Sequence, residues 1–276
     1  VTQYARERGM KTVAPAVPGI VPPEFKRVYP EVRRFQLSWP DRDRFVQDYI
    51  HPADPFYRKL GRAFLEEYCS LYGNDHLYWL ENYLECHIHG PQELQNEVRR
   101  EIAGANFSIV DELDPSGVGL LATWTYSCQP RSSTTQHWPR ALVREHLARV
   151  PGERVRILDQ FAEALPLYKE WDYFDGRPWS IGVVYSFASD THLHGDVRLF
   201  EKQFKEVARE PRARRCVGFC PIEEAIGHNH FFFRFMARLG WNPADVELGS
   251  FTREFAVTRY GAKAAPLMQA SLTELL

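Results

Sequence analysis

Short apolar runs recur along the 276 residues of the chain, and an amphipathic stretch follows each of them. The runs are rich in β-branched and aromatic residues, whereas the stretches between them place apolar residues at helical spacing. This alternation is typical of strand–helix units built around a parallel sheet. Six strands are predicted, at Lys11–Pro18, His76–Glu85, Val118–Tyr126, Val155–Glu163, Ser180–Phe187 and Arg215–Glu223.

Most of the intervals between these runs have the length of one helix. In the clearest one, which begins after Pro52, the residues Phe56, Leu60, Phe64 and Tyr68 recur every four positions. That spacing puts them on one face of a helix, which we expect to pack on the sheet. Further helices are predicted near Trp138–Val150, at about Asn229–Leu239 and over the C-terminal residues from Pro243.

Six strand–helix units without hairpin signals are compatible with a closed barrel or with a doubly wound sheet. No glycine-rich phosphate loop follows a predicted strand, so the sequence gives no support to a dinucleotide-binding fold or a phosphate-loop nucleotidase. In (β/α)₈ barrels the chemistry gathers at the carboxyl ends of the strands. Those ends carry Glu85, Trp124, Tyr126, Asp159, Glu163, Tyr185, Glu223 and Glu224.

The charge balance favours small or uncharged partners. The 34 basic and 36 acidic residues nearly cancel, so the chain as a whole has no electrostatic footprint for nucleic acid or for an anionic membrane. No apolar run approaches the roughly 18 residues that span a bilayer. The first residues lack an initiating Met and look like the end of a helix, so we expect the start of the natural protein to be missing; the compartment and the oligomeric state stay open.

Several segments together resemble the α-N-acetylglucosaminidase family of glycoside hydrolases, from about Gly9 to Gly261. They are GMKTVAPAVPGIVPPEFKRVYP, LSW at Leu37–Trp39, DPFYRKLGRAFLEEY, DHLYWLENYLE, LLATW, ILDQFAEALPLY, VVYSF and the stretch EEAIGHNHFFFRFMARLGW that ends at Trp241. Each is weak alone, but their order and spacing are specific. The resemblance implies an α/β fold, a (β/α)₈ TIM-type barrel that lacks its first two units in this chain, over residues 1–242, followed by a C-terminal helical segment at 243–276.

The resemblance also implies an activity and a site. Family members cleave terminal α-linked N-acetylglucosamine with retention of the anomeric configuration and need no cofactor or metal. The matched motifs put Glu85 at the general acid/base and Glu224 at the nucleophile, and a retaining glycosidase needs two such carboxylates about 5–5.5 Å apart. Trp39 and Trp124 match family tryptophans that offer flat faces to sugar rings. Tyr126, Asp159, Glu163 and Tyr185 complete the expected substrate-binding set.

Some positions near the chemistry depart from the family pattern. Leu84 replaces the usual Asn before the acid/base, Glu81 replaces an Asp, and Glu223 replaces the Pro before the nucleophile. The family's His-Asn-Phe-Gly-Gly strand end is here Tyr185–Ser189. These departures bear on which sugar is accepted, and they leave open a carbohydrate-binding homologue without turnover.

Three histidine pairs raise another class of enzyme. Two histidines separated by one residue share a face of an extended chain, where they could chelate a metal beside Glu85 or Asp190. A metal-dependent barrel hydrolase is therefore the competing hypothesis, although ordinary histidines at the rim are the simpler interpretation. The pairs are His87 with His89, His192 with His194, and His228 with His230.

Overall fold

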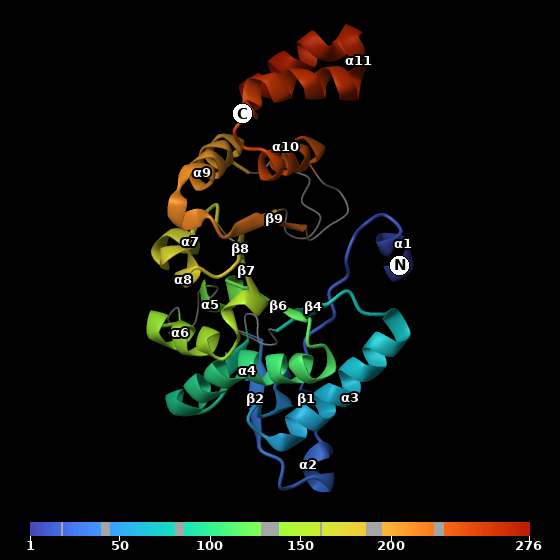
Figure 1. The fold of residues 1–276 in the computed structure, drawn as a ribbon, viewed down its shortest axis with the longest axis vertical. Coiled ribbons are helices and arrows are strands. Elements are labelled where there is room, and N and C mark those ends of the chain that lie inside the picture. Colours follow the sequence, from blue (N-terminus) through green and yellow to red (C-terminus); the bar gives the residue numbers. More distant parts are fainter. Residues whose placement is uncertain are drawn as a thin grey trace. The chain divides into compact units, whose positions relative to one another are not determined.

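The chain forms two compact units, Val1–Ile157 and Leu158–Leu276, in a computed structural model (Figure 1). The structure describes residues 1–17, 19–39, 45–80, 86–127, 138–160, 162–185, 195–223 and 229–276, without the side chains of Ser127, Tyr185 and Glu223. Its strands include a five-stranded sheet with the order β4-β6-β7-β8-β9, accompanied by helices. The chain is therefore an α/β protein.

Three of the predicted parallel strands lie in the first unit. They are β4 (Leu77–Trp79), β6 (Val118–Ala122) and β7 (Val155–Asp159), which runs two residues into the second unit. β4 and β6 pair in parallel, with Leu77 opposite Val118. β6 and β7 are shorter than predicted, because the chain turns away within the apolar run. For β4, residues 81–85 of the predicted run lie outside the described residues. Their residues are largely buried, as both faces of such a sheet are covered.

The prediction of a strand at Lys11–Pro18 is wrong. The described part of this segment makes only an isolated parallel bridge, in which Ala14 lies opposite Tyr78. The Ala14 N–H donates to the Leu77 carbonyl (2.8 Å), and the Ala14 carbonyl accepts from the Trp79 N–H (2.9 Å). Among residues 11–17 no other backbone group is hydrogen-bonded to β4, so the segment adds one bridge to the sheet rather than a strand.

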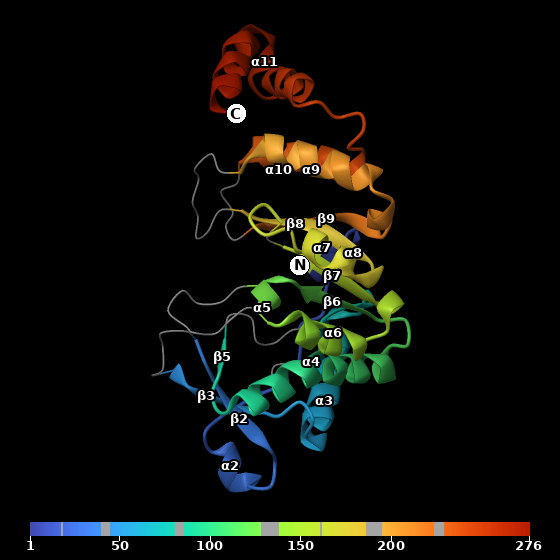
Figure 2. The ribbon, with the colours of Figure 1, turned by 90° about the vertical axis from the view of Figure 1, so that its left-hand side faces the viewer.

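A small antiparallel sheet in the first unit was not predicted. Its order is β1-β3-β2-β5, and Figure 2 shows β2, β3 and β5 next to one another. The segment RFQLS alternates buried and exposed side chains in the manner of a half-buried strand, but it carries no tight-turn signal that would have marked a hairpin. The strands are β1 (Ile20–Val21), β2 (Arg34–Ser38), β3 (Gln47–Ile50) and β5 (His87–Ile88).

The helix predicted after Pro52 is α3 (Pro55–Tyr72). It begins where the Asp54 side chain accepts a hydrogen bond from the Phe56 N–H (2.8 Å), with Pro55 in the first turn.

No helix among the described residues is long and apolar enough to cross a membrane. The other helices of the first unit are α1 (Thr2–Arg6), α2 (Phe25–Val28), α4 (Gln92–Leu113), α5 (Trp124–Ser127) and α6 (Arg140–Ala148).

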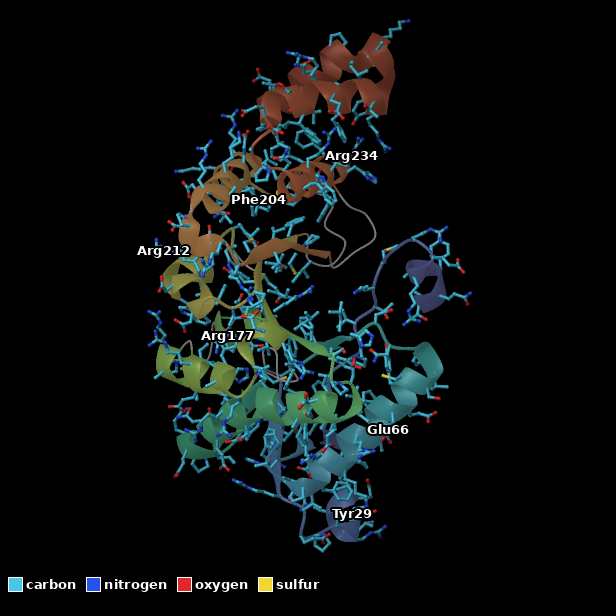
Figure 3. The ribbon with its side chains drawn as sticks, viewed as in Figure 1. Tyr29, Glu66, Arg177, Phe204, Arg212 and Arg234 are labelled. Carbon is cyan, nitrogen blue, oxygen red and sulfur yellow. The ribbon has the colours of Figure 1, made fainter. Side chains whose placement is uncertain are left out.

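The second unit is built on two parallel strands, β8 (Trp179–Tyr185) and β9 (Cys216–Glu223). α9 (Val197–Arg209) packs on them through Phe204, labelled in Figure 3, whose ring centroid is 5.8 Å from that of Phe219 on β9. The remaining helices are α7 (Leu167–Glu170), α8 (Asp172–Asp175), α10 (His230–Trp241) and α11 (Leu248–Leu275), which is broken at Gly261. The C-terminal helices agree with the prediction for the residues from Pro243.

The segment called α8 is a left-handed turn. Its four residues, none of them glycine, have φ between 48° and 57°. A left-handed conformation costs about 1–2 kcal/mol per residue, so the surroundings must hold it in place. Phe174 is buried against Trp179, with 5.9 Å between ring centroids, and the Arg212 guanidinium lies 5.0 Å from the Tyr173 ring (Figure 3).

Candidate active site

Seven residues of sequence separate β4 from β5 of the antiparallel sheet. Residues 81–85, which include Glu85, lie outside the described residues, and the chain resumes at Cys86 just before β5. β5 pairs antiparallel with β2, with His87 opposite Ser38. Trp39 follows Ser38 and is 53% exposed. Trp39 and Cys86, the described residue that follows Glu85 in the sequence, therefore lie at the same end of this strand pair.

The side chains of β5 alternate between the core and the outer face. Ile88 is buried, whereas His87 and His89 are half-buried on the other side, with 4.9 Å between their ring centroids in an edge-to-face arrangement. The Ser38 hydroxyl is 2.8 Å from Nε2 of His89. Of the three predicted histidine pairs, this is the one in which the structure describes both histidines. His192, His194 and His228 lie outside the described residues, and His230 opens α10.

The end of β6 runs into α5, which carries two predicted substrate-binding residues. Trp124 is half-buried, whereas Tyr126 is buried. The Tyr126 ring packs edge-to-face against Trp138 and His146, at centroid distances of 5.2 and 5.5 Å. Of the α5 side chains that the structure describes, Trp124 is therefore the one that stays accessible, and Tyr126 anchors the helix by packing against Trp138 and His146.

His146 closes this aromatic cluster. It is 1% exposed, and its Nδ1 is 2.6 Å from the carbonyl oxygen of Arg99 on α4. Burial lowers the pKa of His146 to about 4, against the smaller opposing effect of that hydrogen bond. The imidazole is therefore neutral at ordinary pH. It was not predicted as special, although it lies on the apolar stripe of α6 with Leu142 and Val143.

Asp159 and Glu163 follow β7 in the second unit. Asp159 is fully buried, and its Oδ2 accepts a hydrogen bond from the Tyr168 N–H (2.9 Å), which ties the end of the strand to α7. Glu163 is half-buried, and its Oε1 accepts from the Val184 N–H on β8 (3.3 Å). Asp159 thus shapes the loop after β7, while Glu163 bridges the carboxyl ends of β7 and β8.

Glu163 has an unusual electrostatic environment. Burial raises its pKa to about 7, and the nearby charge of Asp159 adds a smaller increase, against the lowering effect of its backbone hydrogen bonds. Its second oxygen, Oε2, is buried and has no hydrogen-bond partner among the described residues. At mildly acidic pH this side chain is a neutral carboxylic acid, whose O–H can donate a hydrogen bond.

β8 and β9 end side by side. Their parallel register runs to Tyr185 opposite Glu223, so the chain leaves both strands at the same edge of the sheet. Glu224 follows directly, but residues 224–228 and the side chains of Tyr185 and Glu223 lie outside what the structure describes. The assignments of Glu85, Glu224 and Tyr185 therefore stay predictions.

A cavity of about 450 Å³ in the second unit lies at the other end of these strands. It is lined by residues that include Ile181, Phe204, Glu210 and Cys216, and it contains none of the predicted site residues. Burial raises the pKa of Cys216, so its thiol is not activated. In the described part of the chain, no three His, Cys, Asp or Glu side chains gather in a way that could hold a metal ion.

The sequence matches a known family over most of its length. The sequence model of the α-N-acetylglucosaminidase (NAGLU) TIM-barrel domain covers residues 1–243. The chain belongs to the α-N-acetylglucosaminidase family. Human α-N-acetylglucosaminidase is 30% identical over 268 residues, which are 95% of this chain and 34% of the human protein. The chain thus spans about a third of the length of that relative.

Solved structures of a family 89 glycoside hydrolase from Clostridium perfringens share the fold. The complex of that enzyme with 2-acetamido-1,2-dideoxynojirimycin superposes with a TM-score of 0.74 at 18% identity, over 94% of this chain and 28% of the other. A variant of the same enzyme with two glutamates replaced by glutamine, in complex with its substrate GlcNAc-α-1,4-galactose, gives a TM-score of 0.71 with the same identity and coverage.

Membership in the α-N-acetylglucosaminidase family confirms the resemblance read from the ordered segments. The family model spans Glu85, Glu224 and every predicted substrate-binding residue. The features that sequence reasoning missed are the ones made by packing, namely the enclosed cluster around His146 and the strand pair that carries His87 and His89. The alternation in RFQLS is the one signal that could have indicated that strand pair.

Proposed function

We propose that this chain is the catalytic part of a retaining glycoside hydrolase that releases terminal α-linked N-acetylglucosamine or a closely related sugar. The observation that carries the proposal is the match of residues 1–243 to the family's barrel domain, because that match includes both candidate carboxylates. The Clostridium enzyme of the same fold is described with its substrate GlcNAc-α-1,4-galactose. An α-linked N-acetylglucosaminide is therefore the first substrate to test.

The proposal includes a closed barrel. Residues 1–242 would supply most of a (β/α)₈ barrel, and residues 243–276 its closing helix or the beginning of a helical region. Barrel closure is what would bring the carboxyl ends of β4 and β9 to opposite sides of one opening, as the chemistry requires. The five-stranded sheet with helices supports this arrangement.

The proposed reaction is a double displacement. The Glu224 carboxylate attacks the anomeric carbon while Glu85 gives its proton to the oxygen of the departing group, so the glycosidic bond breaks as the glycosyl–enzyme ester forms. Glu85, now ionised, removes a proton from water. That water attacks the same carbon and releases Glu224, which restores the initial protonation state and the original anomeric configuration.

The other predicted residues fit around this pair in the proposal. Trp39 and Trp124 would offer flat apolar faces to sugar rings, with Tyr126 holding α5 beneath Trp124. Tyr185 and Glu163 would hydrogen-bond sugar hydroxyls at the ends of β7 and β8, and Asp159 would hold the loop between them. The accessible indoles and the proton held by Glu163 support these roles.

The test is the hydrolysis of an α-N-acetylglucosaminide by the full-length protein carrying Glu85→Gln or Glu224→Gln. Each substitution is expected to lower kcat by roughly 10³-fold or more with the fold intact, since acid–base catalysis alone contributes about 10²–10⁴-fold. Glu81→Gln, four residues before Glu85, and Glu223→Gln, directly before Glu224, are the matched controls and should keep most of the activity.

Two further readouts decide between the candidate functions. The first sugar released, followed by NMR, should be the α anomer, whereas the β anomer would exclude a double displacement. Binding of N-acetylglucosamine without any turnover by the unmodified protein would instead favour a carbohydrate-binding homologue, the alternative that Leu84 supports. Activity lost on chelation and restored by a metal would favour the metal-dependent hydrolase.

A further inference from the structure

The cavity of about 450 Å³ at the amino ends of β8 and β9 is large enough for a small molecule, and the proposed function does not use it. Its wall is formed by the last turns of α9 and α10, by the short 3₁₀ turn Pro211–Ala213 and by residues of β8 and β9. Phe204 of α9 belongs to the wall, and Arg212 lies on the 3₁₀ turn (Figure 3). All of these elements belong to the second unit and to the described part of the chain.

Part of the wall is apolar and accessible. Val217 takes part because Trp179 pairs with Cys216 and Ser180 with Gly218, which makes Val217 the extra residue of a β-bulge. Its side chain is 54% exposed. An apolar molecule would therefore bury surface here. The apolar residues of the wall include Ile181, Phe204, Val207, Pro211, Val217 and Pro243.

Two arginine side chains of the wall are free to bind an anion. Arg209 at the end of α9 and Arg214 just before β9 are exposed, and neither guanidinium has an ion pair or hydrogen bond to a described residue. The acidic residue among the described wall residues, Glu210, is already engaged. Its carboxylate accepts hydrogen bonds from the Arg212 N–H (3.1 Å), Nε (2.9 Å) and Nη2 (3.3 Å). Arg212 also holds the pKa of Glu210 below its usual value.

The helix ends at the cavity oppose an anion, but less strongly than the arginines attract it. α9 ends at Arg209, and α10 ends at Trp241, next to Gly240 of the wall. The carboxyl end of a helix carries about half a negative charge, so two ends amount to roughly one. The guanidinium groups of Arg209 and Arg214 carry two positive charges. The balance of about one positive charge suits a single anionic group.

A second hollow of about 430 Å³ shares part of the wall, including Arg209. Its own residues are aromatic or already paired. Tyr168 and Tyr173 line it, and the Lys169 ammonium is engaged by Glu206 at 3.1 Å. The buried Tyr168 hydroxyl has no hydrogen-bond partner among the described residues. Arg209 therefore lies where the two hollows meet, with no acidic partner in the described chain.

We propose that the cavity binds an organic anion, which is a carboxylate or phosphate group carried on an apolar body about the size of a phenyl ring. Arg209 and Arg214 hold the anionic group, because a guanidinium presents parallel N–H donors that match two oxygens of a carboxylate or phosphate. The apolar side of the wall, with Val217, contacts the body of the ligand. Binding here does not depend on the proposed hydrolase, so it is measured without a substrate.

The test is an NMR titration of the full-length protein with four small molecules. Phenyl phosphate and benzoate carry both an anionic group and an apolar ring, whereas inorganic phosphate lacks the ring and benzyl alcohol lacks the charge. The tighter of the first two should bind at least about tenfold more tightly than either of the last two, since ring burial and charged hydrogen bonds each contribute about tenfold or more. Which of the two binds more tightly tells a phosphate ester from a carboxylate.

Matched variants of α9 test the role of the arginines. Arg209→Ala and Arg214→Ala should each weaken the binding of the tighter ligand by about tenfold, through the loss of a charged hydrogen bond. Arg198→Ala is the control, because Arg198 is an exposed arginine at the other end of α9 and is not part of the wall. It should change the affinity by less than about twofold. Ala208→Phe puts a ring at an exposed position of the wall and should abolish binding with the melting temperature unchanged.

A chemical readout locates the ligand without any substitution. The thiol of Cys216 belongs to the wall, whereas that of Cys69 lies on α3 in the first unit, and both cysteines are half-buried. At about four times its Kd, the bound ligand should slow the alkylation of Cys216 by about fivefold, because roughly one site in five is then empty. The alkylation of Cys69, followed by mass spectrometry in the same sample, should not change.

Three results would overturn the anion site. They are equal losses of affinity in Arg209→Ala and Arg198→Ala, affinity for inorganic phosphate equal to that for the ring-bearing anions, and alkylation of Cys216 that the ligand leaves unchanged. Loss of the proposed hydrolase activity in another experiment would leave all of these measurements as they are. Selective weakening in the two wall arginine variants, together with protection of Cys216, supports the site.

Discussion

His146 in the first unit and Glu163 in the second are both ionisable side chains whose pKa burial shifts toward the neutral form, but their surroundings differ. Rings of Tyr126 and Trp138 enclose His146, which is 1% exposed. Glu163 is half-buried and accepts a backbone hydrogen bond from Val184. Burial lowers the pKa of His146 to about 4 and raises that of Glu163 to about 7.

The difference shows what a shifted pKa does and does not indicate. Shifted values gather at functional sites, but packing in a core produces them as well. His146 lies on a helix with its ring sealed between two others, so its shift is a by-product of packing. Glu163 follows a strand at the edge where the barrel chemistry is expected, and it remains partly accessible. Position and access, rather than the size of the shift, make Glu163 the candidate for function.

Truncation of His146 should therefore damage stability and not catalysis. His146→Ala removes a ring that fills the space between Tyr126 and Trp138, so we expect the free energy of unfolding to fall by about 3 kcal/mol. Urea denaturation of the full-length protein measures it. An unchanged unfolding midpoint, or a large drop in kcat at a temperature where the variant is folded, would break the contrast with Glu163.

Substitution of Glu163 should show the opposite pattern. Glu163→Leu removes the hydrogen-bonding group, and we expect kcat/KM to fall about 10²-fold, equivalent to about 2.7 kcal/mol, with little change in unfolding. Activity of the unmodified protein should decline as the pH rises through 7, because the proton leaves Glu163 there. Glu163→Gln keeps the acceptor for Val184 and cannot ionise, so the part of this decline that Glu163 causes should vanish. Full activity in the Leu variant would remove Glu163 from the site.

The two groups should also affect stability in opposite directions with pH. In the unfolded chain the His146 imidazole becomes protonated below about pH 6.5, whereas in the folded protein it stays neutral down to about pH 4. Acidification from pH 7 to 5 therefore favours the unfolded chain and lowers the free energy of unfolding by about 2 kcal/mol. Glu163 keeps a proton up to about pH 7 that the unfolded chain releases above about pH 4.5, so its contribution is lost as the pH rises through that window.

Variants separate these two contributions. Between pH 7 and 4.5 the free energy of unfolding falls in part because His146 becomes protonated in the unfolded chain. That part of the pH dependence should be absent in His146→Phe. The same measurements should become more steeply acid-sensitive in Glu163→Gln, where the opposing contribution is gone. Parallel curves for both variants and the unmodified protein would show that neither group titrates as described.

The smallest effect is expected next to His146 in the sequence. Glu145 is exposed on α6 and pairs with Arg100 of α4 at 3.2 Å. Exposed ion pairs contribute little, so Glu145→Gln should change the free energy of unfolding by about 0.5 kcal/mol or less in the same urea experiment. A loss comparable to that of His146→Ala would mean that the contact between α4 and α6, rather than the buried ring, supports this region.

Much of the fold could be predicted because the signals are local. β4, β6, β7, β8 and β9 each coincide with a predicted apolar run, and the helix after Pro52 follows from its four-residue spacing. The strand predicted at Lys11–Pro18 is reduced to the single bridge between Ala14 and Tyr78. The antiparallel sheet could not be foreseen in the same way. Its partner strand β5 is two residues long, and pairing across fifty residues depends on where the chain returns.

By itself, the sequence determined the succession of strands and helices, the family and the two glutamates proposed for catalysis. Periodicity and ordered motifs depend on residues that are close together in the sequence, so they can be read without the structure. Only the tertiary structure decided which side chains are sealed and which remain accessible. Tyr126 and Trp124 are two positions apart and look equivalent in the sequence, yet one is buried and the other is not. Burial depends on what packs against a residue from distant parts of the chain, and the same packing sets the protonation of His146 and Glu163.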